Sequence, residues 1–120
     1  MNIHIKATGI ELTDAIRKYV EKRIRAIEGK LKEGSVNALA EVEVGKISKH
    51  HQSGDIFRAE IMLSLGSEHF RAVSEKTDLY AAIDDVREKM EREITHKKEK
   101  RLTLRKKGGT AVKKLLRKSR

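Results

Sequence analysis

The chain has 120 residues, 28 Lys and Arg against 18 Asp and Glu, a formal net charge of +10, and no cysteine. This length fits one domain with one hydrophobic core. The lack of cysteine excludes disulfides, thiolate metal sites and a cysteine nucleophile. No apolar run approaches the roughly 20 residues needed to cross a bilayer, so we expect a single-domain cytoplasmic protein with no membrane partner.

Residues 2–8 and the segment that follows predict a strand and then a helix. Apolar and polar residues alternate over 2–8, and Gly9 ends the pattern, as in a strand with one buried face. Thr13 is a candidate N-cap. The apolar residues after it recur at spacings of three and four, namely Ile16, Val20, Ile24, Ile27 and Leu31. We expect one amphipathic helix over residues 13–31.

The middle of the chain predicts three more strands, because apolar and polar residues again alternate there. Gly45 is a candidate bulge in the first of them. The expected strands cover residues 36–47, 57–65 and 69–75, joined by a polar loop over 48–55 and a tight turn at Gly66-Ser67.

A second, longer helix is expected after Thr77 or Asp78, either of which suits an N-cap. Its apolar stripe consists of Leu79, Ile83, Val86, Met90 and Ile94. No glycine or proline follows until Gly108-Gly109, so the helix can extend for about 44 Å. Its turns from about Lys97 are too polar to pack, and we expect them to project or fray.

The element order β-α-β-β-β-α predicts an α+β fold in which two helices pack on one face of a four-stranded sheet. We expect residues 1–107 to form this domain and residues 108–120 to form a flexible basic tail. Residues 97–120 contain 12 Lys and Arg and one acid, Glu99. A segment of this composition favours a polyanionic partner, whereas residues 1–96 are close to neutral and can offer a binding face only if their charges segregate.

Helical wheels at about 100° per residue show such segregation. One flank of the second helix carries Lys89, Arg92, His96 and Lys100, and the other carries Asp84, Glu88 and Glu91. On the first helix, Lys18, Lys22 and Arg25 share the sector away from the core, and Arg23 lies nearer the apolar edge. If the helices lie side by side, their basic flanks can combine into one groove suited to a phosphate backbone. The alternative is ordinary solvated surface with neighbouring charge partners.

The aromatic residues Tyr19, Phe57, Phe70 and Tyr80 are expected in the core or at its edge. This disfavours base stacking and favours recognition of shape and phosphate. His50 and His51 lack the spacing of helical metal ligands. The neighbours Asp84 and Asp85 diverge by about 100° on a helix. We therefore expect no enzyme, metal, cofactor or small-molecule substrate.

Two segments resemble the bacterial family of ribosome hibernation promoting factor and ribosome-associated inhibitor A, in its short form. They are Glu11 to Ile24 and Phe57 to Asp85, and the most specific signature is Asp78-Leu-Tyr-Ala-Ala-Ile-Asp84. The resemblance covers about residues 1–101. It implies a fold like that of double-stranded RNA-binding domains. It further implies binding in the mRNA channel of the small ribosomal subunit across the A and P sites, which excludes mRNA and tRNA from idle ribosomes.

The resemblance also implies that basic residues of both helices contact 16S ribosomal RNA, in the small subunit or in 70S ribosomes. Matching positions on the long helix are Lys89, Arg92, Lys100 and His96, the last where a lysine is more usual. Lys22, Arg23 and Arg25 are chosen by helix face. Two alternatives remain open: a general double-stranded RNA-binding module acting outside the ribosome, and a regulator whose basic tail binds an acidic protein or an anionic membrane.

Overall fold

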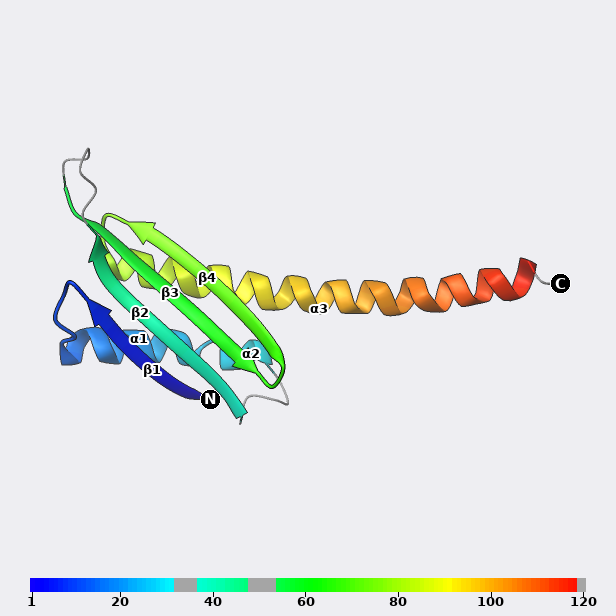
Figure 1. Cartoon of the computed structure of the whole chain (residues 1–120), viewed down its shortest axis with the longest axis horizontal. Helices are drawn as coiled ribbons and strands as arrows, with labels where there is room; N and C mark the ends of the chain where they lie inside the picture. Colours follow the sequence, from blue (N-terminus) through cyan, green and yellow to red (C-terminus); the bar gives the residue numbers. More distant parts are fainter. Residues whose placement is uncertain (32–36, 48–53, 119–120) are drawn as a thin grey trace.

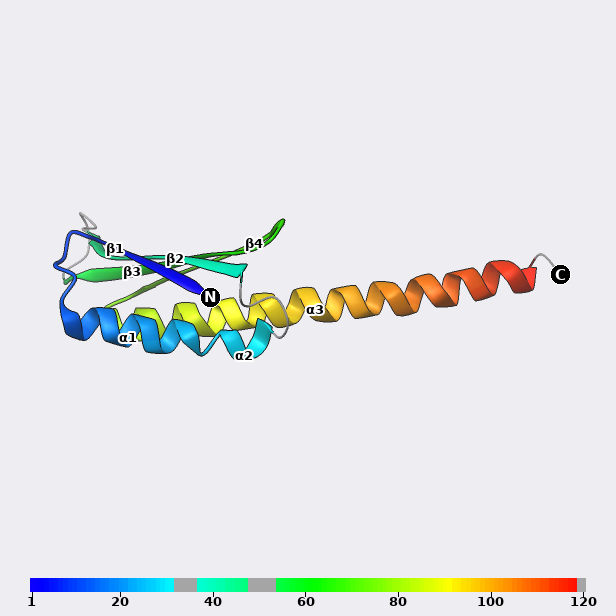
Figure 2. The same ribbon diagram turned by 90° about the horizontal axis from the view of Figure 1, so that it is seen from below.

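The computed structural model describes the backbone of residues 1–31, 37–47 and 54–118, and the side chains of these residues up to residue 100. Its elements are β1 (Asn2–Thr8), α1 (Asp14–Arg25), α2 (Glu28–Leu31), β2 (Ala38–Ile47), β3 (Ile56–Leu65), β4 (Glu68–Lys76) and α3 (Leu79–Lys118). The strands form one sheet, which Figure 1 shows face on, and Figure 2 shows all helices on the same side of it. The predicted α+β fold is confirmed.

The sheet is mixed, with the strand order β1-β2-β3-β4. β1 pairs with β2 in parallel, and the other two pairings are antiparallel. A parallel pair needs a crossover connection, which α1 and α2 supply. The predicted alternation is confirmed, since the helix-facing side chains of β2, β3 and β4 are buried: Ala38, Ala40, Val42, Val44, Ala59, Ile61, Leu63, Phe70, Ala72 and Ser74.

The single helix predicted over residues 13–31 is wrong beyond Arg25. Its start is confirmed, because the Thr13 side chain accepts a hydrogen bond from the Ile16 amide at 3.2 Å. The next turn is tighter than an α-helical turn, because the Ile27 amide donates to the Ile24 carbonyl, three residues back, at 3.0 Å. This short-range bond ends the α-helical pattern and leaves Ile27 fully buried. α2 starts after this turn as a separate element.

Gly45 is not a bulge, because the pairing of β2 with both neighbours runs through it without interruption. Glycine is needed here for a close approach of two backbones. A Cβ atom at this position would lie 2.5 Å from the Thr8 carbonyl oxygen on β1, closer than any side-chain carbon tolerates. The predicted loop over 48–55 falls mostly on residues 48–53, which lie outside the described residues.

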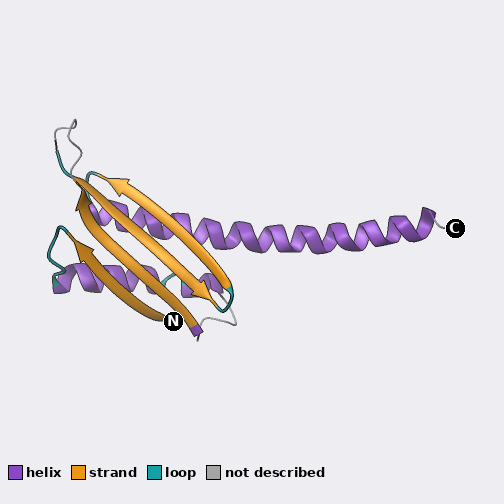
Figure 3. Ribbon diagram, in the orientation of Figure 1, coloured by secondary structure: helices purple, strands orange, loops and turns teal. Residues whose placement is uncertain are grey.

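α3 begins as predicted and ends later. Asp78 is the N-cap, since its carboxylate accepts a hydrogen bond from the Ala81 amide at 2.9 Å. The predicted apolar stripe of α3 is buried against the sheet. The helix continues through Gly108 and Gly109 to Lys118 and projects well beyond the sheet (Figure 3), so the predicted end at the glycine pair is wrong. The domain boundary at residue 107 and the flexible tail stay predictions.

Candidate nucleic-acid interface

A cluster of four side chains joins α1 to α3. The Tyr19 hydroxyl on α1 donates to both carboxylate oxygens of Asp84 on α3, at 2.8 and 2.9 Å. Arg23 on α1 places its Nε 3.1 Å from Asp84 Oδ1 and its guanidinium carbon 5.0 Å from the centre of the Tyr19 ring. The Tyr80 ring on α3 meets the Tyr19 ring edge to face, with centres 4.7 Å apart. These contacts fill the space between the helices.

Burial and the hydrogen bond to Asp84 raise the pKa of the Tyr19 hydroxyl, and the Arg23 charge opposes this in part. The raised pKa keeps the hydroxyl protonated, as donation to a carboxylate requires. Tyr80 is 39% exposed. The expectation that every aromatic residue lies in the core or at its edge is therefore wrong for Tyr80.

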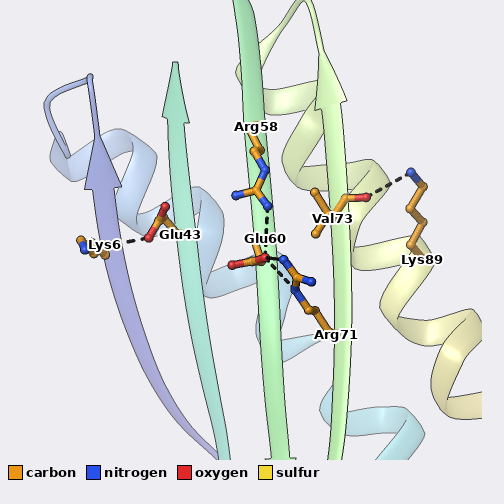
Figure 4. Close-up of polar contacts among 7 residues, drawn as sticks. All are labelled: Lys6, Glu43, Arg58, Glu60, Arg71, Val73 and Lys89. Atoms are coloured by element: carbon orange, nitrogen blue, oxygen red, sulfur yellow. Dashed lines mark hydrogen bonds and ion pairs between the residues drawn. The ribbon is translucent and has the colours of Figure 1, made fainter. Parts of the chain in front are cut away.

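The groove expected between two basic flanks is not formed, because the flank of α3 that faces α1 and α2 carries Tyr80 and Asp84. On the same flank, Lys98 Nζ donates to the Lys30 carbonyl on α2 at 3.1 Å. Lys89 lies on the opposite flank, beside β4 (Figure 4). A helical wheel measures each angle from the core but does not tell on which side the neighbouring helix lies.

Lys89 is held by the body of the protein. Its Nζ donates to the Val73 carbonyl on β4 at 3.2 Å and lies 3.3 Å from Asp85 Oδ2. Asp85 also accepts a 2.6 Å hydrogen bond from the buried Ser74 hydroxyl. The Ser74 bond and the Lys89 charge lower the pKa of Asp85, against the effect of burial. Lys89 is thus partly neutralised by its own neighbours.

Three other predicted residues of α3 are more accessible to a binding partner than Lys89 is. Arg92, His96 and Lys100 are exposed, and none of them makes an ion pair within the described part of the chain. Arg92 and His96 line a shallow hollow of about 410 Å³ together with Lys30 of α2, and the acids Glu91 and Glu99 line it as well. The sequence interpretation missed Lys30, because a single helix over 13–31 gives no sign that the chain turns at Ile27 and starts a separate α2.

The predicted residues of α1 are spread over its surface. Lys22 is exposed, and Arg23 belongs to the cluster with Asp84. Arg25 Nη1 donates to the Met1 carbonyl at 3.4 Å and to Glu28 at 3.2 Å, so it lies toward β1. The structure therefore brings Arg92 and His96 together, leaves Lys22 and Lys100 exposed, and places Lys89 and Arg25 beside opposite edges of the sheet.

The open face of the sheet has a different charge pattern, in which acids and bases pair within β3 and between neighbouring strands (Figure 4). Glu60 on β3 accepts hydrogen bonds from Arg71 at 2.6 and 2.8 Å and from Arg58 at 3.2 Å. The Arg71 bonds are the main cause that lowers the pKa of Glu60. Lys6 lies 4.0 Å from Glu43. Bases with their own acidic partners are poorly suited to bind a polyanion, so the helical face is the better candidate.

A second hollow, of about 480 Å³, is lined by residues of α2, β3, β4 and α3, among them Leu31, Phe70, Ile94 and Lys97. Within the described residues, no three His, Asp or Glu side chains gather as metal ligands, and His50 and His51 lie outside them. The described helices include none that is both long and apolar enough to span a membrane.

Comparisons with known proteins identify relatives of this chain. Residues 3–102 match the family described as Sigma 54 modulation protein / S30EA ribosomal protein. The ribosome hibernation promotion factor of Staphylococcus aureus is 31% identical over 94 residues, which are 78% of this chain and 46% of that protein. The factor of the same name from Lactococcus lactis is 30% identical over 95 residues, 78% and 48% of the two chains. The chain thus spans about half the length of these curated relatives.

Solved structures agree with this assignment. The N-terminal domain of protein Y from Thermus thermophilus has a TM-score of 0.68 and 33% identity, covering 80% of this chain and 98% of that domain. A ribosomal subunit interface protein from Coxiella burnetii has a TM-score of 0.67 and 19% identity, covering 82% and 99%, and shares the fold. The chain belongs to the family of Sigma 54 modulation and S30EA ribosomal proteins, which includes the ribosome hibernation promotion factors.

Proposed function

We propose that this protein is a ribosome hibernation factor that binds the small ribosomal subunit in the mRNA channel across the A and P sites. The observation that carries the proposal is the family match over residues 3–102 together with two relatives of at least 30% identity that are named for ribosome hibernation. The protein acts in the cytoplasm on idle ribosomes, and 16S ribosomal RNA is its main contact.

The mechanism is steric exclusion and involves no covalent step. Side chains of Lys, Arg and protonated His donate hydrogen bonds and have no acceptor atoms, so they suit phosphate oxygens. Exposed cations on the helical face, such as Lys22, Arg92 and Lys100, bind the RNA backbone. The bound domain fills the path of mRNA and tRNA, and inhibition follows its occupancy. Because phosphate contacts release counterions, the affinity falls steeply with salt.

The test compares two charge-matched variants of the full chain. Arg92→Ala with Lys100→Ala removes two exposed cations from the helical face, and Lys6→Ala with Arg71→Ala removes two cations from the open face of the sheet. Binding to purified small subunits is measured by co-sedimentation over a series of salt concentrations. We expect the first variant to lose affinity about tenfold or more, with a salt slope lower by between one and two units, and the second to bind like the wild type.

The outcomes that contradict the proposal are specific. Equal affinity of both variants would show that the helical face is not part of the interface. Full binding in the presence of mRNA and initiator tRNA would contradict steric exclusion. Equal affinity for naked duplex RNA and for small subunits, at one salt concentration, would favour a general double-stranded RNA-binding module instead.

Lys89 is left out of this test for a structural reason. Lys89→Glu would place a second carboxylate beside Asp85 and remove the hydrogen bond to Val73, so a loss of binding could reflect a loss of folding. Arg92 and Lys100 are exposed, and exposed substitutions usually change the free energy of unfolding by less than about 0.5 kcal/mol.

A further inference from the structure

The second hollow, of about 480 Å³, lies at one end of the hydrophobic core, where β3 turns into β4 beside α2 (Figure 1). We call it the apolar hollow. Its lining includes Leu31 of α2, Leu65 of β3, Phe70 of β4 and Ile94 of α3. Phe70 and Ile94 are buried core residues, and Leu31 and Leu65 are half-buried and pack against the core. The hollow is therefore an extension of the core that is partly open to solvent.

One wall of the apolar hollow exists because α1 and α2 are separate elements. After the turn that buries Ile27, α2 lies against α3, where Lys98 Nζ donates to the Lys30 carbonyl at 3.1 Å. This hydrogen bond joins α2 to α3, and Leu31, the next residue after Lys30, lines the hollow. The hollow is thus already formed in the free protein, as small-molecule sites usually are.

Three lysines and one acid share the lining with the apolar residues, namely Lys30, Lys97, Lys98 and Glu68. Lys97 Nζ lies 4.6 Å from the centre of the Phe70 ring and 3.7 Å from Glu68 Oε2, so the charge of Lys97 already has a partner. Lys30 and Lys98 make no ion pair within the described part of the chain. The apolar hollow therefore combines a hydrocarbon lining with two ammonium groups whose charge the described residues do not balance.

We propose that the apolar hollow is a binding site for a small amphipathic carboxylate. The hydrocarbon body of the ligand packs against the apolar lining, and its carboxylate pairs with the ammonium groups of Lys30 and Lys98. The volume lies within the range of roughly 300–1,000 Å³ that is usual for small-molecule sites. Transfer of the hydrocarbon body out of water is favourable, and ammonium groups donate hydrogen bonds that suit a carboxylate.

Other ligand classes fit this lining less well. A nucleic-acid phosphate backbone has the right charge but no hydrocarbon body to cover Leu31, Leu65, Phe70 and Ile94. A cationic amphiphile could cover these residues, but its charge would be repelled by Lys30 and Lys98. The combination of one apolar body and one negative charge is what distinguishes the proposed ligand.

The first experiment compares two probes that have the same hydrocarbon chain and opposite charges, decanoate and decyltrimethylammonium. Each is titrated into the full chain at concentrations below those at which it forms micelles, and backbone amide chemical shifts report affinity and position. We expect decanoate to bind at least about tenfold more tightly and to shift the amides of Leu65, Gly66 and Phe70 most. Octanoate should bind more weakly than decanoate, by up to about fourfold for each methylene removed.

The second experiment compares two variants that lose the same charge. Lys30→Gln with Lys98→Gln removes the two ammonium groups of the site, and Arg17→Gln with Lys18→Gln removes two exposed cations near the start of α1, at the opposite end of the helical layer from α2 (Figure 2). We expect the first variant to bind decanoate about fivefold more weakly and the second to stay within about twofold of the wild type.

A third variant tests the apolar part of the site. Leu31→Trp places a larger side chain in the hollow and should weaken decanoate binding by about fivefold or more, since less volume remains for the hydrocarbon body. Urea unfolding checks that this variant folds. If it does not fold, the comparison of the two charge variants still decides the proposal.

Several results would overturn the proposal. They are equal affinity for decanoate and decyltrimethylammonium, equal losses in the two charge variants, and no saturable binding of decanoate by the wild type. Shifts of the same amides when the protein concentration alone is raised would assign the hollow to a second copy of this chain instead. None of these measurements involves ribosomes, so the proposed function is tested separately by co-sedimentation and can stand or fail without this site.

Discussion

Tyr19 on α1 and Asp84 on α3 are 65 residues apart in the sequence, and the hydroxyl of one donates to both carboxylate oxygens of the other, at 2.8 and 2.9 Å. Arg23 lies beside the same carboxylate, with its Nε 3.1 Å away, yet that N–H is not aligned for a hydrogen bond. The carboxylate thus fixes the two helices against each other and holds a cation next to their junction.

Tyr19→Phe should lower the free energy of unfolding by about 1–2 kcal/mol, because it removes a hydrogen bond to a charged group that is partly shielded from water. Tyr80→Phe is the matched control, since the Tyr80 hydroxyl makes no hydrogen bond within the described residues, and it should stay within about 0.5 kcal/mol of the wild type. Urea unfolding followed by circular dichroism measures both. Equal midpoints for the two variants would show that the Tyr19–Asp84 bond does not stabilise the fold.

The raised pKa of Tyr19 can be measured directly, because the chain contains two tyrosines and Tyr80→Phe leaves Tyr19 alone. An ultraviolet titration should show ionisation above the usual tyrosine range, and adding Asp84→Asn should lower the pKa, since Asp84 is one of the causes that raise it. A raised folded-state pKa gives stability that is fully present below the unfolded-state pKa and is lost as the pH rises through the folded one. No change on adding Asp84→Asn would contradict the assignment.

Asp85 and Glu60 make the opposite contribution. Their pKa values are lowered in the fold, so they stabilise the protein above the ordinary carboxyl pKa of about 4, and this contribution is lost as the pH falls through the folded-state values. Asp85→Asn and Glu60→Gln should each be less stable than the wild type at pH 6 and lose less stability on acidification to pH 3. Parallel curves of unfolding free energy against pH for the wild type and both variants would contradict this.

Gly45→Ala should destabilise the protein by about 1–3 kcal/mol, because its Cβ would meet the Thr8 carbonyl oxygen at 2.5 Å and the parallel strand pair would have to shift. Gly29→Ala is the control, since a Cβ on Gly29 meets nothing within 4 Å and alanine favours a helix by up to about 1 kcal/mol. Thermal unfolding should therefore show a lower midpoint for the first variant and an equal or higher one for the second. The reverse order would mean that β1 and β2 are not closely apposed at this point.

Local sequence patterns predicted most of the fold, and the errors have physical causes. The alternation of apolar and polar residues predicted the strands. The apolar stripe of α3 from Leu79 to Ile94 correctly predicted which residues of that helix are buried. The break near Ile27 was missed because both α1 and α2 keep their apolar residues in phase across it. The continuation of α3 through Gly108 was missed because glycine weakens a helix without forbidding it.

The candidate interface was harder to predict, because it depends on how the elements are arranged around each other. The wheel separated the acidic and basic flanks of α3, but the side on which α1 lies is a property of the tertiary fold. Asp84 was accordingly assigned to an acidic flank, whereas the structure shows it as the partner of Tyr19 and Arg23. Lys89 was taken as a free cation, and its contacts with Val73 and Asp85 depend on how α3 is seated under β4.

The hydrogen bond from Lys89 to the Val73 carbonyl has a consequence for the protein at high concentration. β4 is an outermost strand, and an exposed strand edge is a template on which another chain can add and begin to aggregate. A lysine on that edge resists such addition by charge and by occupying a carbonyl that an incoming strand would need. On the other side of the sheet, Arg25 donates to the carbonyl of Met1, the residue before β1, at 3.4 Å. The outer edge of β4 should therefore be a poor template for a strand from another copy of this chain.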